Sequence, residues 1–171
     1  MKLHTLSKGA MAWFGVKATP LPLTFEVTHR CNLKCKYCDR HTAMPNEMTT
    51  DQALSVLDQF YGLGMRRISL DGGETLLHRD IDKIVDWLAG HGVVMVMNTN
   101  GILIPKRADV VNKLSKVKIS LDGPQASHDL MRGEGAFEKA LAGAHAAKQM
   151  GVGGRRRGVH LRRGQAQRWS Y

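Results

Sequence analysis

The stretch Cys31-Asn-Leu-Lys-Cys35-Lys-Tyr-Cys38 decides the fold of this 171-residue chain. The chain contains only three cysteines, and all of them lie within this stretch. An odd number of cysteines at such close spacing makes a poor disulfide framework, whereas the same pattern in a reducing compartment indicates a metal site. The stretch follows residues 21–28, whose apolar and polar residues alternate as in a β-strand. The sequence therefore predicts a metal-binding loop directly after a strand.

Downstream of the cysteines, segments typical of strands and helices alternate. The pattern predicts further strands at residues 67–70, 93–97 and 117–121. It predicts helices at about 49–62, 81–90, 105–114 and 136–150, the first with a capping box at Thr49 and Gln52. The strand at 93–97 shows no alternation, which predicts burial on both faces. Four successive strand–helix units predict an α/β fold with a parallel sheet and right-handed crossovers.

A distinctive polar motif follows each predicted strand. The cysteine loop follows the first strand, and Asp71-Gly-Gly-Glu74 follows the second. Asn98-Thr-Asn-Gly101 follows the third, and Ser120-Leu-Asp-Gly123 ends the fourth. Ligands of parallel α/β folds bind at the carboxyl ends of the strands, so the four motifs are expected to form one site.

The number of cysteines bears on the kind of metal. A cubane cluster has four irons, so three thiolates leave one iron without a protein ligand, and an open metal position is typical of a reactive site. The alternative is a structural zinc with His29 or His41 as the fourth ligand. Structural zinc sites usually draw their ligands from two separated pairs, which this sequence lacks. The pattern therefore favours a 4Fe–4S cluster on Cys31, Cys35 and Cys38.

The cysteine motif, with an aromatic residue directly before the third cysteine, resembles the signature of the radical S-adenosylmethionine (SAM) superfamily. The resemblance extends over about residues 20–150. It implies a partial parallel (β/α) barrel in which about four of six strand–helix units are present. Gly72, Gly73 and Glu74 resemble the motif that binds the amino group of SAM, since glycines let the chain approach the ligand and a carboxylate suits an ammonium.

Further SAM contacts follow from the resemblance alone. The Asn98–Gly101 segment, with Asn98 and Asn100, resembles the part that lies along the ribose and adenosine; otherwise it is a polar turn capping a strand. Ser120 and Arg132 resemble residues that contact the SAM carboxylate, although Arg132 equally suits a surface salt bridge. Tyr37 is expected to place its backbone near the adenine, or simply to pack beside the cysteine loop.

The resemblance implies a radical SAM enzyme. SAM would chelate the unique iron, and one electron would cleave its carbon–sulfur bond to methionine and a 5′-deoxyadenosyl radical that abstracts hydrogen from the substrate. A peptide or small-molecule substrate and a reductant such as flavodoxin or ferredoxin are implied. Residues 123–133 resemble peptide and cofactor maturases with a cysteine-rich C-terminal extension, which has no counterpart here. A truncated remnant, or a cluster-binding module without turnover, is the alternative.

The basic charge of the chain is concentrated near its C-terminus. The net charge is +10, and residues 151–171 contain six arginines and no acidic residue. We therefore expect three segments: a lead-in at 1–19, the core at 20–150, and a basic tail at 151–171 that is disordered or out of frame and leaves the edge of the fourth strand uncovered. A nucleic-acid-binding protein is an alternative that rests on this tail. No apolar run is long enough to span a membrane, so a cytoplasmic protein is expected.

Overall fold

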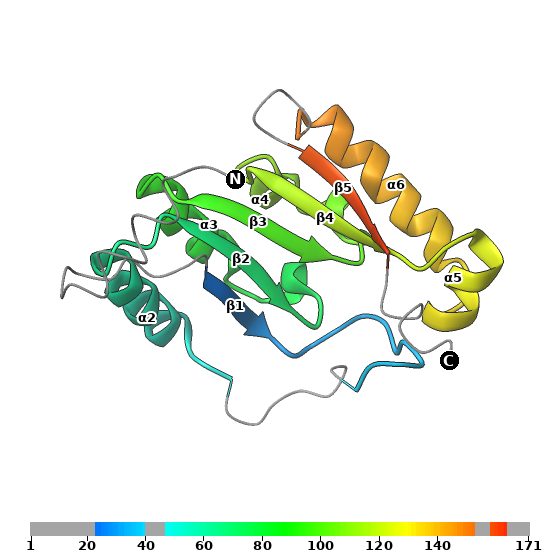
Figure 1. Ribbon diagram of the computed structural model, residues 1–171, viewed down its shortest axis with the longest axis horizontal. Coiled ribbons are helices and arrows are strands. Elements are labelled where there is room, and N and C mark those ends of the chain that lie inside the picture. Colours follow the sequence, from blue (N-terminus) through cyan, green and yellow to red (C-terminus); the bar gives the residue numbers. More distant parts are fainter. Residues whose placement is uncertain (1–22, 40–46, 153–157, 164–171) are drawn as a thin grey trace, which may run out of the picture.

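A single parallel sheet forms the centre of the computed structural model, which describes residues 23–39, 47–152 and 158–163, the last range for its backbone only. Its strands follow one another in chain order: β1 (Leu23–Thr28), β2 (Arg67–Gly72), β3 (Val94–Thr99), β4 (Lys116–Leu121) and β5 (Gly158–Arg163). All five arrows point in the same direction, so the carboxyl ends of the strands share one edge (Figure 1). The predicted α/β fold and parallel sheet are confirmed, and the sheet is open between β1 and β5 in the described part of the chain.

Helices connect the strands and pack against the sheet. They are α2 (Thr50–Gly62), α3 (Ile81–Gly90), α4 (Ala108–Val111), α5 (Gln125–Arg132) and α6 (Ala136–Gln149), with short 3-10 helices η1 (Thr75–Leu77) and η2 (Ile104–Lys106). The predicted capping box of α2 is confirmed, because Thr49 Oγ1 accepts from the Gln52 amide at 3.2 Å and Gln52 Oε1 accepts from the Thr49 amide at 2.9 Å. The cap fixes where α2 begins after the cysteine loop.

Two helical segments differ from the sequence prediction. Residues 105–114 form η2 and α4 instead of one helix, because Arg107 between them has a non-helical backbone with φ −126° and ψ 41°. Helix α5 was not predicted, since the residues it buries are His128 and Arg132 rather than an apolar stripe. A helix whose buried side chains are polar shows no apolar stripe in the sequence, so hydrophobic periodicity does not predict it.

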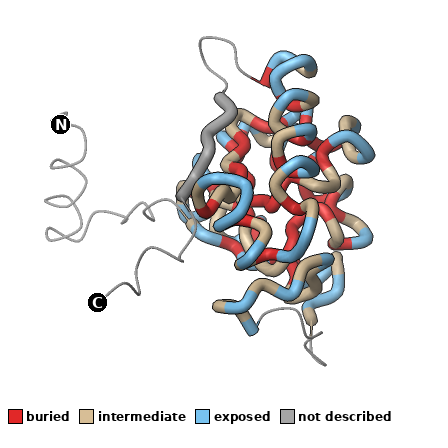
Figure 2. The backbone as a smooth tube through the Cα atoms, turned by 90° about the vertical axis from the view of Figure 1, so that its right-hand side faces the viewer, coloured by how far each residue is buried: buried red, intermediate tan, exposed pale blue. Residues whose placement is uncertain are grey.

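The core lies on one face of the sheet. Alternate strand residues are buried there, and they pack with the inner faces of the helices; Figure 2 shows these buried positions inside the molecule. Examples are Ile68, Leu70, Met95, Met97, Val117 and Ile119. The expectation that the strand at 93–97 is buried on both faces was wrong, because Val94 is 38% exposed and Val96 is half-buried. The second face of the sheet is open enough to admit solvent.

Strand β5 corrects the prediction for the C-terminal segment. It pairs in parallel with β4 from Lys116↔Gly158 to Leu121↔Arg163, so the edge of β4 is covered. Val152, also within that segment, is fully buried and belongs to the core. Only Val159 and Leu161 supply a strand-like alternation among the arginines and glycines, which explains why the strand was missed. Residues 164–171 and the predicted lead-in at 1–19 lie outside the described residues.

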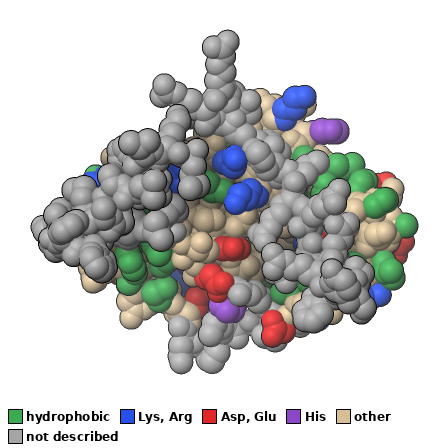
Figure 3. Space-filling model, in the orientation of Figure 1, with side chains coloured by type: hydrophobic (Ala, Val, Ile, Leu, Met, Phe, Trp, Pro, Cys, Tyr) green, Lys and Arg blue, Asp and Glu red, His purple; other side chains and the backbone are tan. Residues whose placement is uncertain are grey.

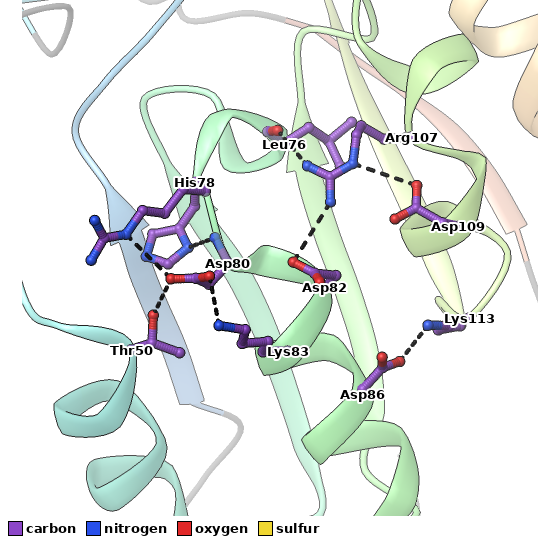
Figure 4. A network of polar contacts seen from close by, with 11 residues as sticks. Thr50, Leu76, His78, Asp80, Asp82, Lys83, Asp86, Arg107, Asp109 and Lys113 are labelled. Atoms are coloured by element: carbon purple, nitrogen blue, oxygen red, sulfur yellow. Dashed lines mark hydrogen bonds and ion pairs between the residues drawn. The ribbon is translucent and has the colours of Figure 1, made fainter.

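A polar network on the helical side joins α2, α3 and α4 (Figure 4). Asp80 precedes α3, accepts the Thr50 hydroxyl at 2.6 Å and pairs with Lys83 at 3.0 Å. Arg107 donates to the Leu76 carbonyl at 3.3 Å and lies 3.4 Å from Asp109. These contacts join the helical segments that connect the strands. In the described part of the chain, no helix is long and apolar enough to cross a bilayer.

Candidate active site

The three cysteines lie together on one loop after β1. Each is half-buried and free of any disulfide, and the Cys38 amide donates to the Cys35 carbonyl at 3.0 Å, which turns the loop between them. Burial raises the pKa of the Cys31 thiol, and the nearby charges of Glu74 and Cys38 raise it further. Burial also raises the pKa of the Cys35 thiol, whereas Arg132 acts in the opposite direction. The charges of Glu74, of Arg132 and of neighbouring cysteines therefore all affect the pKa values of these two thiols.

This loop fits a cubane cluster by its donor set. Three thiols on one partly exposed loop match three thiolate ligands and leave a fourth iron open. Among the described residues, no three His, Cys, Asp or Glu side chains group as they would around a single metal ion. Of the two candidate fourth ligands for zinc, His29 pairs with Glu26 at 3.3 Å, and His41 lies outside the described residues.

Gly72 and Gly73 bring the end of β2 against the start of the cysteine loop. A Cβ atom on Gly72 would lie 2.2 Å from the Thr28 carbonyl oxygen, and one on Gly73 would lie 2.4 Å from the Arg30 carbonyl oxygen. The Gly73 amide also donates to the Thr28 carbonyl at 2.8 Å. We expected glycines here so that the chain can approach a ligand; in the structure they let it approach the backbone of the cysteine loop. Any side chain at either position would push that loop away.

Glu74 connects two of the predicted motifs. Its carboxylate is fully buried and accepts the Thr99 hydroxyl at 2.8 Å, the Asn100 amide at 2.8 Å and the Leu76 amide at 3.1 Å. Burial raises the pKa of Glu74, and these hydrogen bonds oppose the rise. A carboxylate has about four acceptor positions, so one remains for a further donor. In this arrangement Glu74 organises the Asn98–Gly101 turn.

Hydrogen bonds to β2 and to the cysteine loop hold the Asn98–Gly101 turn in place. Asn98 Nδ2 donates to Asp71 Oδ2 at 3.0 Å, and Asn98 Oδ1 is buried without a hydrogen-bond partner within the described residues. Asn100 Nδ2 donates to Asn32 Oδ1 at 2.7 Å, which joins the turn to the cysteine loop. Thr75 is buried and donates its hydroxyl to the Asn98 carbonyl at 2.9 Å. An orphaned acceptor here is available to a hydroxyl or amine of a ligand.

Arg132 reaches the same region from the end of α5. It is 9% exposed, and its Nε and Nη2 atoms donate to Asp122 at 2.6 and 3.2 Å. The Tyr37 hydroxyl donates to Asp122 as well, at 3.2 Å, and burial raises the pKa of Tyr37. Arg132 is therefore no surface salt-bridge residue, since its partner is fully buried. Ser120 lies in β4, in register with Arg162 of β5.

The structure gathers the predicted motifs at one edge of the sheet. The Glu74 amide donates to the Arg30 carbonyl at 2.8 Å, and the Tyr37 hydroxyl donates to Asp122 at 3.2 Å, so the segments after β2 and β4 both meet the cysteine loop. Sequence reasoning missed Asp122, Thr99 and Asn32. All three stand inside the motifs quoted from the sequence, but nothing in the sequence shows that a motif residue binds another motif rather than a ligand.

The comparisons with known proteins agree with this geometry. Residues 25–161 match the family model described as the Radical SAM superfamily. The chain belongs to the radical SAM superfamily. It is 35% identical to the AdoMet-dependent heme synthase of Nitratidesulfovibrio vulgaris over 138 residues, which cover 76% of this chain and 38% of that protein. It is 33% identical to the mycofactocin maturase MftC of Mycolicibacterium smegmatis over 130 residues, which cover 71% of this chain and 33% of that protein.

Solved structures share the fold. The crystal structure of Streptococcus suis SuiB bound to S-adenosylmethionine superposes with a TM-score of 0.68, 18% identity, and coverage of 92% of this chain and 36% of that one. The chain thus spans well under half of these relatives, and the family match includes most of β5. The superfamily uses a 4Fe–4S cluster together with SAM, the two cofactors that the sequence predicted.

Proposed function

We propose that this chain holds a 4Fe–4S cluster on Cys31, Cys35 and Cys38 and places SAM against it for reductive cleavage. The observation that carries the proposal is the hydrogen bonding of the cysteine loop to the Gly-Gly-Glu, Asn-Thr-Asn-Gly and Ser-Leu-Asp-Gly motifs at one sheet edge. A reduced cluster held by Cys31, Cys35 and Cys38 would supply one electron that breaks the carbon–sulfur bond of SAM into methionine and a 5′-deoxyadenosyl radical, and that radical would take a hydrogen atom from the substrate.

The residues of the chain supply binding and orientation. Glu74 keeps one acceptor position for the amino group of SAM, and the Asn98 Oδ1 atom without a partner accepts from a ribose hydroxyl. Arg132 and Ser120 face the SAM carboxylate in this proposal, and the segment around Tyr37 borders the adenine. The tight approach of Gly72 and Gly73 to the cysteine loop would hold a cluster on that loop close to the Gly-Gly-Glu motif.

The open face of the sheet is the place for a substrate. Polar and partly exposed strand residues lie on it together with Val94 and Val96, and Ser69, Asp71 and Lys118 lie there beside Asn98. Figure 3 shows acidic and basic side chains near the middle of the face viewed in Figure 1. The named relatives are a heme synthase and a mycofactocin maturase, which supports a peptide or a small molecule as the substrate class. A flavodoxin or ferredoxin as reductant and a cytoplasmic location complete the proposal.

The test is anaerobic. The protein is reconstituted with iron and sulfide, reduced, and mixed with SAM, and 5′-deoxyadenosine is measured by mass spectrometry. The wild type is expected to form it, and Cys35→Ala is expected to lose both the cluster absorption and the product. Ser55→Ala, an exposed change on α2, is the matched control and is expected to behave as the wild type.

The outcomes separate the alternatives. A cluster that forms without SAM cleavage would support the cluster-binding module and refute turnover by this chain. A stoichiometric zinc content with no cluster would refute the proposal entirely. Salt-dependent binding to nucleic acid without a cluster would instead favour the basic-tail alternative.

A further inference from the structure

A buried network ties the cysteine loop to the end of β4 and to α5. Asp122 lies directly after β4, and its carboxylate is fully buried. It accepts two hydrogen bonds from Arg132, at 2.6 and 3.2 Å, and one from the Tyr37 hydroxyl at 3.2 Å. One carboxylate therefore holds a residue of α5 and a residue of the cysteine loop at the same time.

Two further hydrogen bonds strengthen the connection. The Lys36 amide donates to the Met131 carbonyl at 2.9 Å, so the backbone between Cys35 and Cys38 is tied to the last turn of α5. The Asp122 amide donates to His128 Nδ1 at 3.2 Å, which fixes α5 to the end of β4. The Arg132 guanidinium carbon also lies over the Tyr37 ring, 5.6 Å from the ring centroid. The position of the loop thus depends on residues that follow the fourth strand.

The network also balances charge beside the cysteines. Arg132 and Asp122 form a buried ion pair, and Asp122 also accepts from Tyr37, which lies between Cys35 and Cys38. Removing one member of a buried pair leaves the other charge uncompensated. The charge and hydrogen bonding around a cluster set its reduction potential. A change at Asp122 would therefore alter the reduction potential of a cluster held by Cys35.

We propose that Asp122 is a positioning residue of the cofactor site, which orients Arg132, holds the Tyr37 segment of the cysteine loop and balances the arginine's charge beside the cluster. This inference rests on the proposed function, since it presumes a cluster on the three cysteines. It assigns Asp122 no contact with SAM. Its effect is exerted through the two residues that it holds.

The first test uses the protein without cofactors. Tyr37→Phe and Asp122→Asn are combined in a double-mutant cycle of melting temperatures, with Tyr37→Phe and Ser55→Ala as the control pair. We expect Tyr37→Phe to lower the melting temperature of the wild type by more than that of Asp122→Asn, because the amide oxygen of asparagine is a weaker acceptor than a carboxylate. Additive effects would overturn the contact. If Asp122→Asn does not fold, Asp122→Asn with Arg132→Gln takes its place in the cycle, because both buried charges are then removed.

The second test measures the reduction midpoint of the reconstituted cluster by a potentiometric titration followed by electron paramagnetic resonance. Asp122→Asn leaves the positive charge of Arg132 uncompensated, so the midpoint is expected to shift to a more positive potential. Adding Arg132→Gln is expected to return it toward the wild-type value, which a purely structural role would not do. If the wild type holds the cluster and Asp122→Asn has the same reduction midpoint as the wild type, this inference alone is refuted. A wild type that forms no cluster would refute the proposed function and this role together.

Discussion

Replacing Gly143 of α6 with alanine tests the packing that holds the Asn98–Gly101 turn. A Cβ atom at Gly143 would lie 2.1 Å from the Gly101 carbonyl oxygen and 2.8 Å from its carbonyl carbon. Both atoms belong to the backbone, so no side chain can rotate to make room. Helix α6 or the turn must therefore move, and the turn carries Asn100, which is hydrogen-bonded to Glu74 and to Asn32.

The expected magnitude is the difference between two opposing effects. Overpacking costs about 1–3 kcal/mol, and contact with rigid backbone favours the upper end of that range. Alanine gains about 1 kcal/mol over glycine within a helix. The net loss is therefore about 2 kcal/mol for Gly143→Ala. For a chain of this size, it corresponds to a decrease in melting temperature of about 4–8 °C.

The assay is thermal unfolding of the cofactor-free protein, followed by circular dichroism. Gly90→Ala in α3 is the matched control, because a Cβ atom there meets nothing within 4 Å. It is expected to be neutral or to stabilise by up to about 1 kcal/mol. If Gly143→Ala melts at or above the wild-type temperature, α6 does not pack on the Gly101 backbone and the reasoning is refuted.

Three further predictions concern buried and capping residues. Glu74→Gln places an amide nitrogen against backbone and hydroxyl donors, so it should lower the free energy of unfolding in urea by about 1–3 kcal/mol. The exposed change Glu138→Gln is the control and should be neutral. Equal urea midpoints for the two variants would contradict the buried network. Leu57→Ala removes a fully buried side chain and should cost about 2–5 kcal/mol, against little for Leu63→Ala, which is 60% exposed. Hydrogen bonds from Thr50 and Lys83 lower the pKa of Asp80 to about 2, so its contribution to stability is complete above about pH 4 and is lost as the pH falls through 2. The melting temperatures of wild type and Asp80→Asn should therefore differ at pH 6 and converge near pH 2, and a gap independent of pH would argue against that pairing.

Local patterns made the first four strands and most helices predictable. The capping box at Thr49 and the apolar spacing of α3 and α6 are short-range signals, and each is present in the structure. The strand ends were predictable for the same reason, because polar motifs interrupt apolar runs. Strand β5 was missed because only Val159 and Leu161 are apolar among its arginines and glycine, and helix α5 was missed because it buries His128 and Arg132.

The contacts within the site were not predictable from local patterns. Asp122 stands 85 residues after Tyr37, and Asn100 stands 68 residues after Asn32, so no periodicity links the members of either pair. The resemblance to the superfamily assigned Gly73 and Glu74 to a ligand, and it says nothing of what these residues do before a ligand binds. Only the fold shows that Gly73 approaches Arg30 and that Glu74 holds Thr99.

These contacts show how the site keeps its shape without cofactors. Glu74 and Asp122 are two fully buried carboxylates beside one cysteine loop, and buried charges are tolerated only when they are hydrogen-bonded or paired. Glu74 meets this condition by fixing the Asn98–Gly101 turn, and Asp122 meets it by fixing Arg132 and Tyr37. Each charge would be destabilising if its motif moved away, so the folded state itself favours the assembled arrangement. The residues proposed to meet SAM are therefore positioned by the chain in advance, and binding need not supply the energy to order them.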